Sequence, residues 1–112
     1  MTQLTNEPLI TEQSAQADFI TPAIIGASFY GTSGGIQTAY IQVTGFVGII
    51  TFQATLNDIV DQAVWFDVDT YGDGTTVITE TTSRNLIGNF VFVRAVVTEF
   101  TAGTINTVTL AY

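Results

Sequence analysis

Carboxylates are the side chains of this sequence with the most obvious potential for chemistry, because the chain contains no histidine, cysteine or lysine. Catalytic triads, thiol nucleophiles and Schiff bases are therefore excluded. Two closely spaced carboxylate pairs remain, Asp58 with Asp61 and Asp67 with Asp69. Two carboxylates can hydrolyse a glycosidic bond, but they need a cleft that holds the sugar between them. A small domain with short strands offers little room for such a cleft, so we expect the protein not to be an enzyme.

The sharpest polar motif is the sequence DVDTYGDG, which contains Asp67, Asp69 and Asp73. Oxygen ligands at alternate positions before a glycine turn resemble a calcium-binding loop. The match is incomplete, because Tyr71 occupies the third ligand position and Ile78 stands where a bidentate acid belongs. A solvated strand end that leads into a turn explains the same residues. We therefore predict no bound metal or cofactor, and the three aspartates are only weak candidate ligands.

Aromatic side chains provide a second kind of candidate site. Trp65, Tyr71 and Tyr30 could together stack on a sugar ring. In all-β proteins, however, aromatic side chains more often lie in the core or in a subunit interface. Three aromatic residues are candidates for interface contacts. They are Phe29 and Tyr30 in a short apolar run, and Tyr112 after the apolar residues of the last predicted strand.

Arg94 is a further interface candidate, because it lies in the middle of a predicted strand. An unpaired charge at such a position is costly. We expect Arg94 to pair with a carboxylate, either within the sheet or across a subunit boundary. Glu80, Glu99 and Asp67 are possible partners, and the sequence does not choose among them.

The composition narrows the possible partners. The 112 residues form one domain, with 46% hydrophobic residues, only 11% charged residues and a net charge of −8. Soluble domains usually contain about 25% charged residues, so this polar but weakly charged surface suits a protein partly covered by other subunits. A monomer with a neutral polar surface is the alternative explanation of the same composition. Two arginines are too few to neutralise a phosphate backbone, so we expect no nucleic-acid partner. We also expect no membrane span and no signal peptide, because no apolar run has the required length and pattern.

Alternation of apolar and hydroxylated side chains predicts an all-β fold of about six to eight short strands separated by turns. Turns at residues 45–48 and 101–104 would make two hairpins, and residues 71–74 would form a further turn. These elements predict a two-sheet antiparallel β-sandwich, similar to a jelly roll. The predicted strands of the body are residues 36–44, 49–56, 64–69, 75–82, 90–100 and 105–112.

The amino-terminal segment differs from this body. Residues 2–18 are polar, contain Pro8 and show no sustained period. We predict an extended arm and first strand over residues 1–35, and a sandwich body over residues 36–112. The arm either docks on a neighbouring molecule or stays a tail without fixed structure, and a helix over residues 11–19 is a less favoured alternative.

Several apolar and hydroxylated segments of the body form a recognisable series. They are residues 41–46 (IQVTGF), 48–54 (GIITFQA), 64–68 (VWFDV) and 88–98 (GNFVFVRAVVT), followed by the TAGT turn and the TVTL ending. Together these segments resemble the small β-sandwich proteins of tailed-bacteriophage virions. This resemblance implies a structural role, either as a capsid decoration (cement) protein or as a module of a tail, fibre or baseplate. It also implies a trimer, which such proteins commonly form, and a terminal arm that holds neighbouring subunits, as decoration proteins often use.

The resemblance therefore favours a non-enzymatic virion protein that stabilises the capsid shell through subunit contacts. Its expected partners are further copies of itself, as a trimer, and the major capsid protein. The expected location is the virion, assembled in the host cytoplasm. The alternative is a tail module that binds a host carbohydrate or receptor through aromatic residues near Trp65.

Overall fold

A computed structural model describes residues 6–14, 16–26, 36–57, 64–88 and 90–111 of the chain. Within these ranges the protein forms seven β-strands and no helix, and every strand pair is antiparallel. The all-β antiparallel fold class is confirmed. The strands are β1 (Asn6–Gln13), β2 (Phe19–Ile20), β3 (Ile24–Ile25), β4 (Ile36–Thr55), β5 (Phe66–Tyr71), β6 (Ile78–Ile87) and β7 (Phe92–Ala111).

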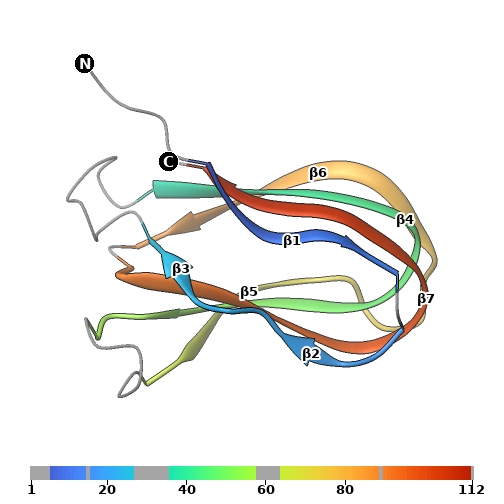
Figure 1. The fold of residues 1–112 in the computed structure, drawn as a ribbon, viewed down its shortest axis with the longest axis horizontal. Helices are drawn as coiled ribbons and strands as arrows, with labels where there is room; N and C mark the ends of the chain where they lie inside the picture. Colours follow the sequence, from blue (N-terminus) through green and yellow to red (C-terminus); the bar gives the residue numbers. More distant parts are fainter. Residues whose placement is uncertain (1–5, 15, 27–35, 58–63, 89, 112) are drawn as a thin grey trace.

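Two long strands, β4 and β7, carry the whole architecture. Each has 20 residues, and the two pair with each other almost from end to end. Both strands bend in the middle, so that the two halves of the sheet face each other (Figure 1). The upper layer of Figure 1 holds β1, β6, the first half of β4 and the second half of β7. The lower layer holds β2, β3, β5 and the remaining halves of β4 and β7.

The predicted hairpin turns at residues 45–48 and 101–104 are wrong, because both segments lie inside continuous strands. The pairing register of β4 with β7 shifts in this region, and such bulges bend a strand without ending it. Gly45 and Gly103 supply the positive φ angles, 59° and 83°, that the bend needs. A Cβ atom on Gly103 would overlap the backbone carbonyl of Gly45. Glycines that we interpreted as chain reversals are therefore points of close backbone approach.

Other strand boundaries also differ from the predicted ones. The strand predicted at 75–82 is β6, which begins at Ile78 and runs to Ile87. Ser83, Arg84 and Asn85 therefore belong to the strand, although they were expected to follow it. An edge strand tolerates such polar residues, because only one of its sides pairs with the sheet.

The core lies between the two layers, where alternate residues of β4 and β7 point inward. Aromatic rings gather near the bend: the Phe46 ring centroid is 5.3 Å from that of Phe100 and 6.5 Å from that of Tyr71. Every buried side-chain nitrogen or oxygen in the described residues has a hydrogen-bond partner. The largest fully buried side chains are Tyr71, Phe46, Phe52, Ile41, Ile50, Leu86, Ile105, Leu110, Gln37, Val43, Val93 and Val97.

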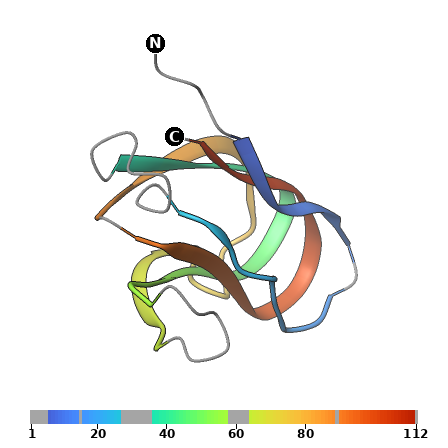
Figure 2. The same cartoon turned by 60° about the vertical axis from the view of Figure 1, so that its left-hand side comes forward.

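The described part of the amino-terminal segment pairs with its own chain. Strand β1 lies along the second half of β7, while β2 and β3 lie along the first half (Figure 2). Leu9 and Ile10 of β1 are buried, and the Thr21 hydroxyl accepts a 2.9 Å hydrogen bond from the Ala95 amide. The helix considered for 11–19 is wrong, since these residues include the end of β1 and the start of β2. The predicted boundary at residue 35 lies outside the described residues.

Candidate functional site

A β-bulge in β5 separates the two aspartates of the DVDTYGDG motif. Gln53 of β4 pairs with Asp67, while the preceding residue, Phe52, pairs with Asp69. One step along β4 therefore corresponds to two steps along β5, which leaves Val68 as the extra residue. Since neighbouring residues of β4 point to opposite faces, Asp67 and Asp69 also point to opposite faces. Strict alternation along a regular strand would place both aspartates on one face, and the bulge prevents this.

On the outer face of the lower layer, a polar row crosses three neighbouring strands. Arg94 of β7 donates from Nε to Oε1 of Gln53 over 2.9 Å. Gln53 in turn donates from Nε2 to Oδ1 of Asp67 over 2.9 Å. The Arg94 guanidinium also lies over the Trp65 ring, with Cζ 4.2 Å from the ring centroid. Arg94 thus hydrogen-bonds the neutral Gln53 in place of the expected carboxylate, and it reaches Asp67, one of its three predicted partners, only through Gln53.

A second polar cluster lies where β5 approaches β6 from the facing layer. The Tyr71 hydroxyl donates to Oε2 of Glu80 over 2.7 Å. Burial, and then this hydrogen bond, raise the pKa of Tyr71 far above its usual value. Arg84 lies 3.8 Å from the Asp69 carboxylate and over the Tyr71 ring. The Arg84–Asp69 pair is partly exposed and therefore adds little stability, but the cluster closes the gap between β5 and β6 with polar groups.

Asp73 has a local role in the turn after β5. Its carboxylate accepts hydrogen bonds from the amides of Thr75 and Thr76, at 2.9 and 2.8 Å, and from the Thr76 hydroxyl at 2.7 Å. The backbone hydrogen bonds from Thr76 and Thr75 hold the pKa of Asp73 well below its usual range. Since Asp67, Asp69 and Asp73 each have separate protein partners, the structure does not bring them together as a ligand set. No group of three or more acidic side chains in the described residues is arranged to hold a metal ion.

The predicted aromatic platform does not form as expected. Tyr71 is only 2% exposed and packs against Phe46, so its ring cannot stack on a ligand. Trp65 is half-buried, and Arg94 covers one face of its ring. The remaining candidates Phe29, Tyr30, Tyr112, Asp58 and Asp61 lie outside the described residues.

The described surface has a group of exposed apolar side chains that was not predicted from the sequence. Five large apolar side chains, between 40% and 73% exposed, lie at or beside the ends of β4, β5 and β6. Figure 1 shows that these strand ends lie on the side of the molecule opposite the bend. The alternation of apolar and polar residues did not indicate this surface. It shows which face of a strand a residue occupies, but not which strand ends lie on the same side of the molecule. We call this surface the apolar end, and it consists of Ile36, Leu56, Val64, Phe66 and Ile87.

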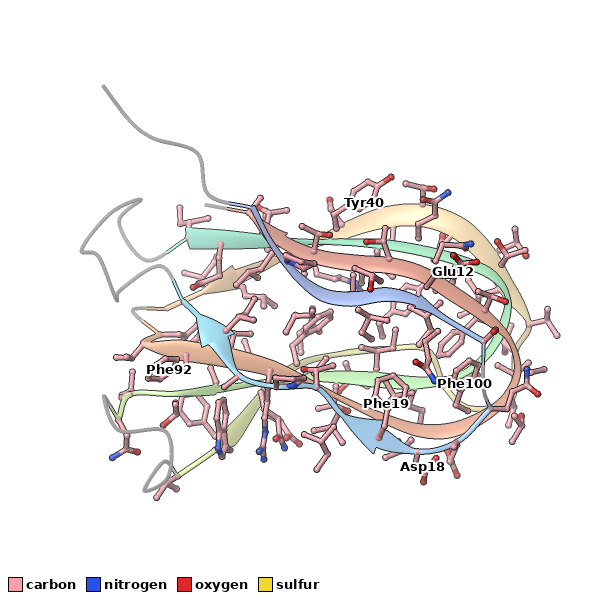
Figure 3. The ribbon with its side chains drawn as sticks, viewed as in Figure 1. Glu12, Asp18, Phe19, Tyr40, Phe92 and Phe100 are labelled. Atoms are coloured by element: carbon pink, nitrogen blue, oxygen red, sulfur yellow. The ribbon has the colours of Figure 1, made fainter. Side chains whose placement is uncertain are left out.

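A shallow pocket lies where β2 pairs with β7. Phe19, Ile20, Val96 and Val97 line it together with two polar residues at its margin. Figure 3 shows Phe19 turned toward the interior, and this half-buried ring packs against the core. No charged group points into the pocket from a buried position among the described residues, so it lacks the polar contacts that orient a small ligand.

Comparisons with known proteins do not assign the chain to a family. No protein-family model, curated protein or solved structure gives a significant match. No helix of the described residues has the length and apolar character to cross a membrane.

Proposed function

We propose that the protein is a non-enzymatic structural component of a tailed-bacteriophage virion that decorates the capsid shell. The observation that carries this proposal from the structure is the apolar end. Surface patches of this kind on a small domain usually mark sites of protein contact. The strand segments resemble those of small virion proteins, and this resemblance suggests the major capsid protein as the partner.

The body of the protein suits a passive binding role. Nineteen hydrophobic residues of the described ranges are buried in one core between the layers, and the buried polar side chains of these ranges all have partners. We infer that the two facing layers constitute a two-sheet β-sandwich of the jelly-roll type, joined by the bent strands. A rigid body of this type can present the apolar end without paying a large ordering cost on binding.

The energetics of the apolar end fit an attachment surface. Full burial of one large apolar side chain contributes about 1.5–3 kcal/mol. Leu56 and Val64 are 64% and 73% exposed, so most of that contribution is still available for a contact. The sparse charge on the chain leaves this contact mainly apolar. The protein would therefore attach to the shell by burying the apolar end against a capsid subunit.

Counting copies in purified particles tests this proposal directly. A copy number comparable to that of the major capsid protein is expected. A copy number in the range of tail proteins would instead favour the alternative, a tail, fibre or baseplate module that binds a host carbohydrate or receptor. Absence of the chain from purified particles would contradict both virion roles.

A pair of matched double variants tests the attachment surface. Leu56→Thr with Val64→Thr should weaken binding to capsids that lack the protein by at least about tenfold, because it removes apolar area from the contact. Ile20→Thr with Tyr40→Thr alters exposed apolar residues elsewhere and should leave capsid binding unchanged. Equal losses in the two double variants would exclude the apolar end as the attachment surface.

A further inference from the structure

Among the described strands, β6 forms a long edge that pairs on one side only. Nine of its ten residues pair with β4, and no other described strand pairs with it. From Glu80 to Ile87 the register with β4 runs without a shift, so this part of the edge is regular. An edge of this kind presents a row of backbone N–H and C=O groups that another strand can bind.

The charges along β6 are complementary to themselves. Glu80 and Arg84 lie two residues on either side of Thr82. If two copies of β6 pair antiparallel about an axis at Thr82, Glu80 of each copy lies directly opposite Arg84 of the other. Opposite charges at directly opposed positions stabilise an antiparallel pair, and like charges destabilise it.

We propose that β6 is a self-association edge, at which two copies of the chain pair antiparallel about a two-fold axis through Thr82. The charges select this register. Moving the axis by one residue, to Thr81 or Ser83, leaves both charges opposite neutral residues. Moving it to Glu80 or Arg84 places two like charges opposite each other. Such a contact uses the same strand on both copies and closes at two subunits, so it predicts a dimer in place of the trimer that the resemblance implies.

The remaining residues of the edge fit the same register. Thr81 lies opposite Ser83, which pairs two exposed hydroxyl side chains. Val77 and Ile87, 67% and 73% exposed, lie opposite each other at the two ends of the paired segment. Contacts within one copy use Oε2 of Glu80 and Nη1 of Arg84, so each side chain has a second polar atom that can reach the other copy.

The other described edges lack these properties. In β5 the charged residues Asp67 and Asp69 are both acidic, so self-pairing about Val68 would oppose two carboxylates. In β1 the register with β7 shifts between Pro8 and Ile10, which interrupts the edge. Strands β2 and β3 have two residues each and are too short to hold a second chain.

Single-cysteine variants test the register, because the chain contains no cysteine of its own. Thr82→Cys places two thiols directly across the axis, within reach of a disulfide. Thr81→Cys and Ser83→Cys place their thiols on diagonal positions, about 7–8 Å apart. Thr82 is half-buried while Thr81 and Ser83 are exposed, so random collisions would favour the two control positions. Under mild oxidation we expect the disulfide-linked dimer to form several-fold faster at position 82 than at either control. Equal or faster cross-linking at the controls would overturn the register.

Sedimentation of the full chain over a range of concentrations tests the association and its charge dependence. We expect a reversible dimer in the wild type, and Arg84→Glu should raise its dissociation constant by about tenfold. The charge swap, Glu80→Arg with Arg84→Glu, should recover most of that loss. Asp69→Asn removes the partner of Arg84 within the same copy and should leave the dimer unchanged. A monomer at all concentrations, a trimer, or a charge swap that dissociates like Arg84→Glu would overturn the proposal.

Discussion

The bend and the apolar end are opposite in both position and packing. At the bend, β4 and β7 pass from one layer to the other without ending, and Phe46 and Phe100 are almost fully buried there. At the apolar end, strands begin and end, and large apolar side chains remain 40–73% exposed. Burial is what converts an apolar side chain into folding stability. The comparison therefore predicts that the aromatic side chains at the bend contribute more to stability than the exposed side chains of the apolar end, which remain available for a partner.

A matched pair of phenylalanine truncations tests this comparison most strongly. Phe46→Ala should lower the free energy of unfolding by about 3–5 kcal/mol, because it empties a site between Phe100 and Tyr71. Phe66→Ala at the apolar end should cost less than about 1.5 kcal/mol, since Phe66 is 40% exposed and its main aromatic contact is Phe90. Urea denaturation of both variants measures the difference. Similar losses in the two variants would show that stability is not concentrated at the bend.

Two glycines at the bend allow a finer test with a smaller expected effect. Gly45 and Gly103 both have positive φ, so alanine costs backbone strain of about 1 kcal/mol at either position. Only at Gly103 would the new Cβ also overlap backbone atoms, those of Gly45 and Phe46. Gly103→Ala should therefore reduce the free energy of unfolding by at least about 1 kcal/mol more than Gly45→Ala. Equal losses would mean that the two strands can separate at the bend without cost.

The strands were predictable from the sequence, but their continuity was not. Alternation located the residues of β4 and β7, because it reports which residues point inward. Glycine favours both chain reversals and β-bulges, because both need a positive φ angle. The sequence therefore does not distinguish a bulge at Gly45 or Gly103 from the turns that we predicted there. Distinguishing the two requires knowing that β4 and β7 stay paired across the bend. That pairing joins residues far apart in the sequence.

The polar sites were predictable only in part, and for a similar reason. Burial cost indicated that Arg94 needs a partner, but the structure gives it the neutral Gln53 and not the expected carboxylate. The bridging residue, Gln53, lies 41 residues away and carries no charge, so nothing in the sequence singled it out. The bulge at Val68 reverses the face of Asp69 relative to Asp67, and only the pairing with β4 shows it. The spacing of Glu80 and Arg84 suggests a pairing register only once β6 is known to lie at the edge of the sheet.

The smallest expected effect concerns two tyrosines that differ in burial. Tyr71 packs beside Phe46 and its pKa is raised, whereas Tyr40 is 42% exposed and points away from the molecule in Figure 3. The unfolded chain releases the Tyr71 proton near pH 10, while the folded protein retains it to higher pH. The stability that this proton contributes is therefore complete below pH 10 and is lost as the pH rises above it.

Replacing each tyrosine by phenylalanine separates the two environments. Tyr71→Phe should cost about 1 kcal/mol at neutral pH, through loss of the hydrogen bond to Glu80. Above pH 10 its free energy of unfolding should decline less steeply than that of the wild type, because phenylalanine has no hydroxyl proton to lose. Tyr40→Phe changes an exposed side chain and serves as the matched control at neutral pH, where it should cost less than Tyr71→Phe. Denaturant titrations from pH 7 to pH 11 measure the wild type and Tyr71→Phe. If Tyr71→Phe declines in parallel with the wild type above pH 10, the Tyr71 hydroxyl is not sequestered beside the bend, and the contrast between the two ends of the molecule would rest on apolar packing alone.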